Sequence, residues 1–342
     1  MLFAKKKGDK GMTDKMNENT SFAPVVASSP HMRHGVSSTR SIMLDVLIAL
    51  ALPGFASIFL FGWGTVGIMS VCVASCMATE YMFCLLRHRV KMPRDLQNIQ
   101  TVGDLSAAVT GLLLAFNLPA GYPLWQAALG GIAAIAAVKM LFGGLGQNIV
   151  NPALAGRIIL MISYPDTMNR YLMPFRDGGV DAVSSATPLA AVQSGENIYQ
   201  YKDLFFGLHP GTLGEVCVAV LLIGGIYLVL RRVITPLVPA CFIGTVFVLT
   251  WMLGQDPVYH ILSGGLMLGA IFMATDYTTS PITWVGRVIF AVGCGILTVI
   301  IRLYGSLPEG VSFAIIIMNI LTPLIDRYTL PRPFGKRKGE TA

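Results

Sequence analysis

Long hydrophobic runs alternate with short polar connections along most of this chain. Each run is expected to form a helix, because about 20 apolar residues at 1.5 Å per residue cross the core of a bilayer. The runs cover residues 42–62, 64–86, 104–118, 122–142, 153–164, 212–230, 235–253, 259–275, 283–301 and 310–326. The pattern therefore predicts an all-α polytopic membrane protein with about ten transmembrane helices.

Some of these runs are too short to cross a core of about 30 Å as straight helices. Runs 104–118 and 153–164 are short, and so are their counterparts five runs later, 259–275 and 310–326. Interrupted segments at matching places in two halves are typical of inverted repeats with broken helices. We expect two five-helix repeats, at 41–164 and 212–328. Ordinary helix ends capped by Gly and Pro are the alternative explanation of each single break.

Composition and charge support a membrane protein, since 54% of the 342 residues are hydrophobic and 13% are charged. The net charge of +7 does not indicate nucleic-acid binding, because the basic residues cluster at loop ends. With the N-terminus inside, only four of the 25 Lys and Arg lie outside: Arg170, Arg176, Lys202 and Arg302. The positive-inside rule thus predicts two cytoplasmic termini and an outer loop at 165–211. Residues 1–40 are expected to be a disordered cytoplasmic tail, and 329–342 a basic cytoplasmic tail.

Polar residues inside or beside the apolar runs are candidates for function, because ionisable groups in a bilayer are costly. Asp45 and Glu80 lie deepest and are candidates for an ion path, with a helix–helix hydrogen bond as the alternative. Two polar turns on the predicted cytoplasmic side offer a further site for a flavin ring, a polar ligand or a cation. Their candidate residues are Gln147, Asn148, Asn151, Asp276, Thr278 and Thr279. Well-capped turns would explain the same residues without a ligand.

Other kinds of chemistry find little support. None of the six cysteines lies in the predicted outer loop, so no disulfide is expected there. Cys72 and Cys76 share one helix face without a CxxC motif, and the five histidines are scattered. We therefore predict no metal site, and no catalytic side chain. The chain also has no GxGxxG or P-loop motif for a nucleotide.

One polar stretch of the outer loop carries the most specific signal. In Ser-Ala-Thr-Pro-Leu-Ala-Ala-Val, Thr187 is a good N-cap and Pro188 a good first residue of a short helix. The same geometry suits a phosphate, because a helix N-terminus supplies free N–H groups. Local physics alone favours the cap.

A resemblance adds to this interpretation. Asp181-Ala182-Val183-Ser184-Ser185-Ala186-Thr187 resembles the flavinylation motif Asp-x-x-Ser-(Gly/Ala/Ser)-Ala-Thr, with Ser185 where Gly is commoner. From about residue 40 to 330 the chain is similar to the D-subunit family of Rnf-type ion-translocating ferredoxin:NAD oxidoreductases. The B subunit of the sodium-translocating NADH:quinone reductase is related. The stretches GGLGQNIVNPALAGR and FMATDYTTSP are also similar to parts of that family.

The resemblance implies a function and a set of partners. A flavin transferase would join FMN through its phosphate to Thr187, with Asp181, Ser184, Ser185 and Ala186 forming the recognised turn. The flavin would relay electrons between a second flavinylated subunit and other subunits in the bacterial inner membrane, coupled to movement of Na⁺ or H⁺. A urea-transporter-like fold is implied, and a riboflavin near Gln147–Asn151 and Asp276–Thr279 is a further expectation.

Two other functions stay open at this stage. A passive channel or secondary transporter for a small polar solute would explain the helices and their breaks, but not the Ser-Ser-Ala-Thr turn. A purely structural subunit is the third interpretation. A covalent flavin would distinguish the redox function from both of these alternatives, since only the redox function requires one.

Overall fold

The computed structural model describes residues 38–89, 103–175, 186–193, 199–215, 217–305 and 309–330. The predicted tails lie almost entirely outside these ranges. The described residues are mainly helical, and their extended pairing is an isolated bridge between Pro119 and Thr212. The prediction of an all-α fold is therefore confirmed for the described part of the chain.

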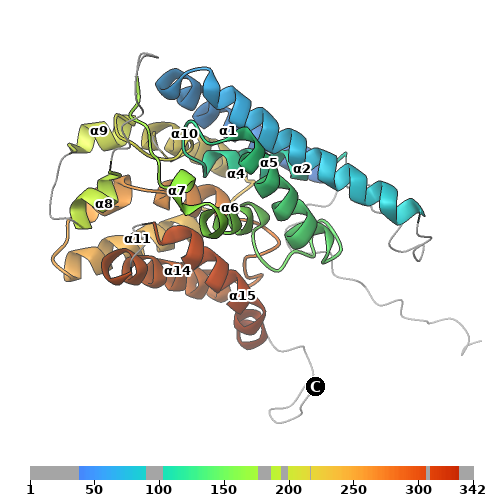
Figure 1. The fold of residues 1–342 in the computed structure, drawn as a ribbon. Helices are drawn as coiled ribbons and strands as arrows, with labels where there is room; N and C mark the ends of the chain where they lie inside the picture. Colours follow the sequence, from blue (N-terminus) through green and yellow to red (C-terminus); the bar gives the residue numbers. More distant parts are fainter. Residues whose placement is uncertain are drawn as a thin grey trace, which may run out of the picture. The chain divides into compact units, whose positions relative to one another are not determined.

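The helices of the first half match the predicted runs closely (Figure 1). The long helix α1 begins where the Ser38 hydroxyl accepts a hydrogen bond from the Ser41 amide, and it ends at Gly62, whose φ of 82° a side chain would disfavour. The bounds are α1 (Thr39–Phe61), α2 (Gly64–Arg89), α4 (Ser106–Phe116), α5 (Leu124–Ala133), its π-helical continuation η1 (Ala134–Met140) and α6 (Pro152–Ser163).

The described residues of the predicted outer loop include three short helices, and the second half follows. The short helices are α7 (Pro165–Met168), α8 (Pro188–Gln193) and α9 (Tyr201–Phe206). The second half comprises α10 (Val218–Leu230), α11 (Leu237–Met252), α12 (Pro257–Leu262), α13 (Leu266–Leu268), the π-helical η2 (Gly269–Met273), α14 (Trp284–Tyr304) and α15 (Val311–Thr329).

Four of the described helices are long and apolar enough to cross a membrane: α1, α2 to Leu86, α14 and α15. Shorter apolar helices accompany them, including α4, α6, α10 and α11. Large apolar side chains point outward from several helices, such as Phe55 at 70% exposure and Trp251 at 69%. In water such side chains would be unfavourable, but a bilayer accommodates them. The chain is therefore a multi-pass membrane protein.

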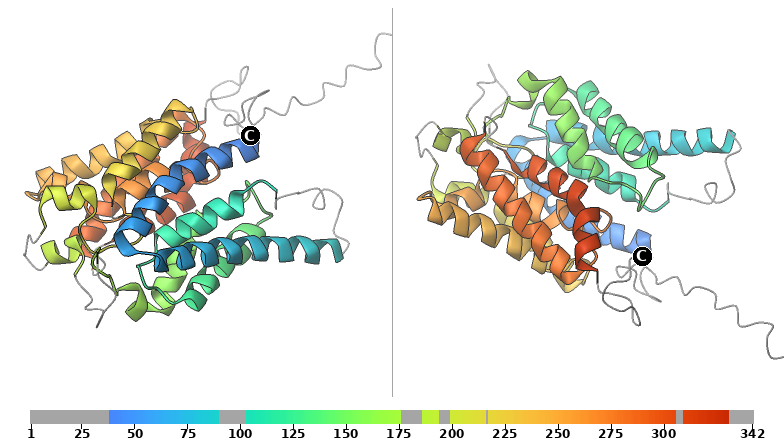
Figure 2. Two further views of the ribbon diagram at one scale, coloured as in Figure 1. Left: turned by 90° about the horizontal axis from the view of Figure 1, so that it is seen from above. Right: turned by 90° about the horizontal axis from the view of Figure 1, so that it is seen from below.

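The helices pack in corresponding pairs within each half. In the first half α2 packs on α4 and α5, and α5 packs on α6. In the second half α11 packs on α12 and α14, and α14 packs on α15. The halves meet where α1 packs on α10 and where α6 packs on α15. In both views of Figure 2, α1 lies between the green helices of the first half and the orange and red helices of the second.

The predicted segments differ from the structure in three places. In the run 212–230, α10 begins at Val218, since Thr212 forms the bridge to Pro119 and residues 213–215 form a turn. The run 259–275 is broken at Ser263–Gly265, where Gly264 has a φ of 67°. The run 310–326 is not short, since α15 accommodates Pro323 and continues to Thr329. The shortness of 104–118 and 153–164 is confirmed, with 11 residues in α4 and 12 in α6.

A close approach between α2 and α4 gives a test of the packing. A Cβ at Gly111 would lie 2.7 Å from Val73 Cα and 2.8 Å from the Cys72 carbonyl oxygen, and backbone cannot swing away. Gly111→Ala should therefore destabilise the fold by about 1–3 kcal/mol, seen as a lower melting temperature of the detergent-solubilised protein. Gly244→Ala is the matched control, because a Cβ at Gly244 meets nothing within 4 Å. Equal melting temperatures of the two variants would contradict the packing.

Candidate functional site

Thr187 lies at the start of helix α8, as the sequence predicts. Its hydroxyl accepts a hydrogen bond from the Ala190 amide at 3.4 Å, and its carbonyl accepts one from the Ala191 amide at 2.9 Å. Thr187 is only 6% exposed, whereas the preceding Ala186 is exposed. Asp181, Ser184 and Ser185 lie outside the described residues. The structure thus places the last two positions of the predicted motif, with the threonine in a capping position.

Helix α8 is held against the break between α12 and α13. The Tyr259 hydroxyl donates to the Pro188 carbonyl at 3.3 Å. A Cβ at Gly264 would lie 2.6 Å from Leu189 Cδ1, so glycine at this position lets the two segments touch. Helix α8, a described part of the loop that the sequence marks for function, therefore contacts a broken helix of the second half.

The two polar turns that the sequence pairs do lie together. Asn151 caps α6 by accepting hydrogen bonds from the Ala153 and Leu154 amides, and its Nδ2 donates to the Met273 carbonyl at 3.3 Å. Asp276 follows η2 and accepts from the Thr278 and Thr279 hydroxyls at 3.1 and 3.2 Å. The turn after η1 and the turn after η2 thus meet at the N-terminus of α6.

Asp276 is the ionisable residue among the candidate residues of these two turns. Burial raises the pKa of its carboxyl, while hydrogen bonds from Thr278, Thr279 and the Asn148 side chain oppose that rise. Asn148 is buried and also donates to the Val150 carbonyl at 3.3 Å. Gln147 is exposed, and within the described part of the chain its side chain makes no hydrogen bond to Asp276. The predicted group therefore comes together without Gln147.

The two candidates for an ion path lie in separate ion pairs. Glu80 on α2 accepts from Lys139 of η1 at 2.8 Å, and both side chains are almost fully buried. Lys139 also donates to the Ser106 hydroxyl at 2.6 Å. Asp45 on α1 accepts from Arg231 at 3.2 Å and from the Tyr227 hydroxyl at 3.0 Å. The geometry is that of helix–helix contacts, and a role in an ion path stays a prediction.

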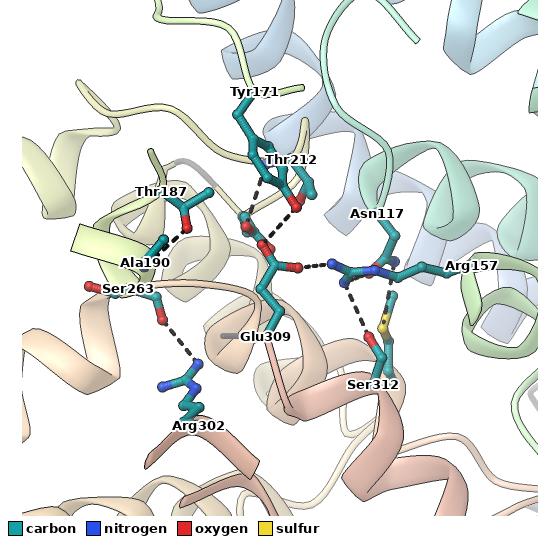
Figure 3. A network of polar contacts seen from close by, with 12 residues as sticks. Asn117, Arg157, Tyr171, Thr187, Ala190, Thr212, Ser263, Arg302, Glu309 and Ser312 are labelled. Atoms are coloured by element: carbon teal, nitrogen blue, oxygen red, sulfur yellow. Dashed lines mark hydrogen bonds and ion pairs between the residues drawn. The ribbon is translucent and has the colours of Figure 1, made fainter. Parts of the chain in front are cut away.

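Sequence reasoning missed a buried polar cluster between the two halves, drawn in Figure 3. Arg157 of α6 donates to the Asn117 side chain at 2.8 Å, to the Ser312 hydroxyl at 3.1 Å and to Glu309. The other carboxylate oxygen of Glu309 accepts from the Tyr171 hydroxyl at 3.3 Å. We define these five residues as the Arg157 cluster. Arg157 is an intramembrane arginine, and that signal alone marks it as a candidate.

A second buried arginine lies nearby. Arg302 of α14 is 2% exposed and donates to the carbonyls of His260 and Ser263 at 2.6 and 3.1 Å. These carbonyls belong to the last turn of α12 and the break that follows it. Arg302 therefore completes the backbone hydrogen bonds of a broken helix inside the protein, as the lack of water there demands.

Comparison with known proteins gives the family. The model of the NQR2, RnfD, RnfE family matches residues 25–335. This chain belongs to that family. It is 46% identical to the D subunit of the Na⁺-translocating ferredoxin:NAD⁺ oxidoreductase complex of Acetobacterium woodii, over 92% of this chain and 96% of the relative. It is 40% identical to the D subunit of the proton-translocating complex of Clostridium ljungdahlii, and 37% identical to that of an ion-translocating oxidoreductase complex of Escherichia coli.

The family assignment confirms the predicted resemblance and the predicted enzyme class. As a member of the NQR2, RnfD, RnfE family, the chain is a subunit of an ion-translocating oxidoreductase. It therefore works beside other subunits in the bacterial inner membrane. The relative at 46% identity is named for Na⁺ translocation, and the relative at 40% identity is named for proton translocation.

The Lys139–Glu80 pair gives a second test. Lys139→Met would leave the Glu80 carboxylate buried without its cation, so we expect a loss of about 3–5 kcal/mol in folding free energy. The double variant Lys139→Met/Glu80→Gln removes both charges and should regain most of that loss. Thermal melts of the detergent-solubilised variants measure it. A double variant no more stable than Lys139→Met would show that the buried charge is not the cause.

Proposed function

We propose that the chain is the membrane subunit of an ion-pumping electron-transport complex and carries covalent FMN on Thr187. The motif Asp181–Thr187 is the single observation that carries this proposal, in a chain whose family includes named ferredoxin:NAD⁺ oxidoreductase subunits. A flavin transferase would attach the FMN, and the flavin would exchange electrons with a second flavinylated subunit. Movement of Na⁺ or H⁺ through the membrane would be coupled to that transfer.

The surroundings of Thr187 fit a phosphoester. The hydroxyl oxygen accepts from the Ala190 amide, and the phosphate oxygens of an ester on that atom would be further acceptors for amides at the helix start. The start of α8 adds a weak positive dipole that suits a phosphate charge. Since Thr187 is only 6% exposed, the transferase must reach it before α8 packs on α12 or while the two are apart. When bound, FMN would supply one- and two-electron redox chemistry.

The topology that this function needs also has structural support. Corresponding helices pack in corresponding pairs in the two halves, and each predicted run contains helix. We propose that these segments form ten spans in two inverted repeats with a urea-transporter-like arrangement. Both termini then lie in the cytoplasm and Thr187 on the outer side, because the Lys and Arg bias assigns the stretch 165–211 outside.

The turns at Asn148–Asn151 and Asp276–Thr279 form the proposed second site, for riboflavin or a cation. Three features support it: a buried carboxylate, two asparagines and the irregular backbone between η2 and α14. Within the hydrocarbon region of a bilayer, non-helical backbone is stable only where it is buried in protein or lines a polar cavity.

The attachment site has a direct test. Thr187→Val keeps the side-chain shape but removes the hydroxyl, so covalent flavin should be lost completely. In-gel fluorescence and the intact mass of the denatured protein, co-expressed with a flavin transferase, measure the attachment. The matched control is Thr283→Val, because the Thr283 hydroxyl likewise caps a helix, accepting from the Gly286 amide at 3.0 Å. Flavin retained in Thr187→Val would place the attachment elsewhere, and an unmodified wild type would favour a solute channel.

The variant Asp276→Asn tests whether the proposed second site acts in ion-coupled turnover. Asp276→Asn keeps the shape of the turn and most of its hydrogen bonds but removes the charge. We expect ion-coupled turnover of the complex in proteoliposomes to fall about tenfold or more, about 1.4 kcal/mol of barrier, while membrane expression stays unchanged. Asp256→Asn is the control, since Asp256 also caps a helix, by accepting from the Val258 and Tyr259 amides. Unchanged turnover in Asp276→Asn would reduce Asp276 to a capping residue.

A further inference from the structure

Glu215 is a buried carboxylate that takes no part in the sites described above. It is 2% exposed and lies in the turn 213–215, where the Leu213 amide donates to the Leu118 carbonyl at 2.9 Å. Its Oε1 accepts one long hydrogen bond, from the Thr212 amide at 3.4 Å. Within the described part of the chain, its Oε2 has no hydrogen-bond partner. A buried carboxylate oxygen without a donor is costly, so a donor is expected beside it.

Arg157 lies close to this oxygen but does not bind it. A Cβ at Gly265 would lie 3.0 Å from Glu215 Oε2 and 3.8 Å from Arg157 Nη1, so both charged groups border one point. Among the described residues, however, the ion pairs do not include these two groups, and Arg157 pairs with Glu309 instead. The gap between the carboxylate and the guanidinium is therefore longer than a direct contact and short enough for a bridging water molecule.

Glycine at position 265 leaves room at this point. Apart from Gly265 and its two neighbours, Glu215 Oε2 and Arg157 Nη1 are the described heavy atoms within 4 Å of the Cβ position. The φ of Gly265 is −72°, which residues with a side chain also adopt, so the backbone conformation does not require glycine. The place of the missing side chain is thus bordered by a carboxylate and a guanidinium rather than by apolar groups.

Further buried polar groups in this region, drawn in Figure 3, can donate a hydrogen bond. Arg157 Nε and the hydroxyls of Thr212 and Ser263 have no partner within the described part of the chain. Thr212 and Ser263 are both 0% exposed. Thr212 already binds Glu215 through its amide, and Ser263 lies two positions before Gly265. Three donors and one acceptor form a set that ordered water satisfies, because a buried water makes about three hydrogen bonds to otherwise unpaired groups.

We propose that ordered water binds at this point and joins Glu215 to Arg157 where the two halves meet. The water donates a hydrogen bond to Glu215 Oε2 and accepts from the guanidinium and hydroxyl groups around it. No covalent bond changes, and both charged groups keep their charges. The turn 213–215, helix α6 and the α12–α13 break are then linked through water, whose hydrogen bonds exchange partners readily. Neither the water nor its test depends on a flavin at Thr187.

Charged ligands fit this place less well than water does. A metal cation would be repelled by Arg157 and by Arg302, whose charge also interacts with that of Glu215. An anion would be repelled by Glu215 and Glu309. Two guanidinium groups balance two carboxylates here, so a neutral ligand keeps the region neutral. Water is a neutral ligand small enough for the place of one missing side chain.

Electron cryomicroscopy of the intact complex in lipid nanodiscs, at a resolution that shows ordered water, tests the proposal. The wild-type map should contain a density peak about 2.5–3.0 Å from Glu215 Oε2, the length of an O–H···O hydrogen bond. Gly265→Ala places a methyl group at this point, so the peak should be lost. Gly67→Ala is the matched control and should keep the peak, because a Cβ at Gly67 makes an ordinary contact, 3.6 Å from Leu124 Cδ2.

A second variant separates the loss of water from simple crowding. Gly265→Ser adds a hydroxyl that can donate to Glu215 Oε2 in place of the water, whereas Gly265→Ala adds a group that cannot. Thermal melts of the solubilised complex should therefore give Gly265→Ser a higher melting temperature than Gly265→Ala, although serine is the larger residue. Crowding alone predicts the opposite order.

Several outcomes would overturn the proposal. A wild-type map in which a side chain contacts Glu215 Oε2 directly, with no peak beside it, shows that water is not needed. A peak that appears only when Na⁺ is in the buffer shows that a metal cation binds instead. A peak that persists in Gly265→Ala contradicts the position given to the water. The wild-type map decides the question even if neither variant of Gly265 assembles.

Discussion

Arg157 is the group on which the joining of the two halves depends. Its guanidinium donates to Asn117 in the first half and to Ser312 and Glu309 in the second. An arginine buried in a bilayer is stable only when carboxylates and carbonyls or amides surround it. Three parts of the chain must therefore meet near the Arg157 side chain: the end of α4, the start of α15 and the segment around Tyr171. The ends of these elements follow from the need to satisfy one cation.

The same requirement explains the broken helices. Once a helix stops inside the membrane, its free carbonyls need donors that the lipid cannot supply. Arg302 provides them for α12, Asn151 provides one for η2, and the Leu213 and Gly214 amides provide them for the end of α4. Each break is thus matched by a polar side chain or backbone from elsewhere in the chain. This gives the protein a buried polar interior, which an ion-coupled redox subunit needs and a simple helical bundle lacks.

The candidate sites lie on these breaks rather than on the long helices. Thr187 caps a helix that packs on the α12–α13 break, and Asp276 follows η2 at the N-terminus of α6. A break is where a two-state change costs least, because the hydrogen bonds there are made by side chains that can exchange partners. If Thr187 carries the proposed flavin beside one break and the Asp276 turn binds the proposed ligand beside another, charge at one site would bias the other.

The sequence by itself determined the helical class, the helix-forming segments and the threonine motif. Those features are local: apolar run length sets helix position, and Thr187-Pro188 sets a helix start. It also paired the Asn151 turn with the Asp276 turn, since both carry polar residues at the ends of short segments. Only the tertiary structure decided which charges meet. Glu80 and Lys139 form an ion pair although they are separated by 59 positions in the sequence. Arg157 and Glu309 are separated by 152 positions. Contacts over such separations depend on how helices pack, and no local pattern of residues encodes them. The missed break at Ser263–Gly265 did carry a local signal, the pair Gly264-Gly265. Only the tertiary structure shows that Arg302 and Leu189, distant in sequence, lie against it.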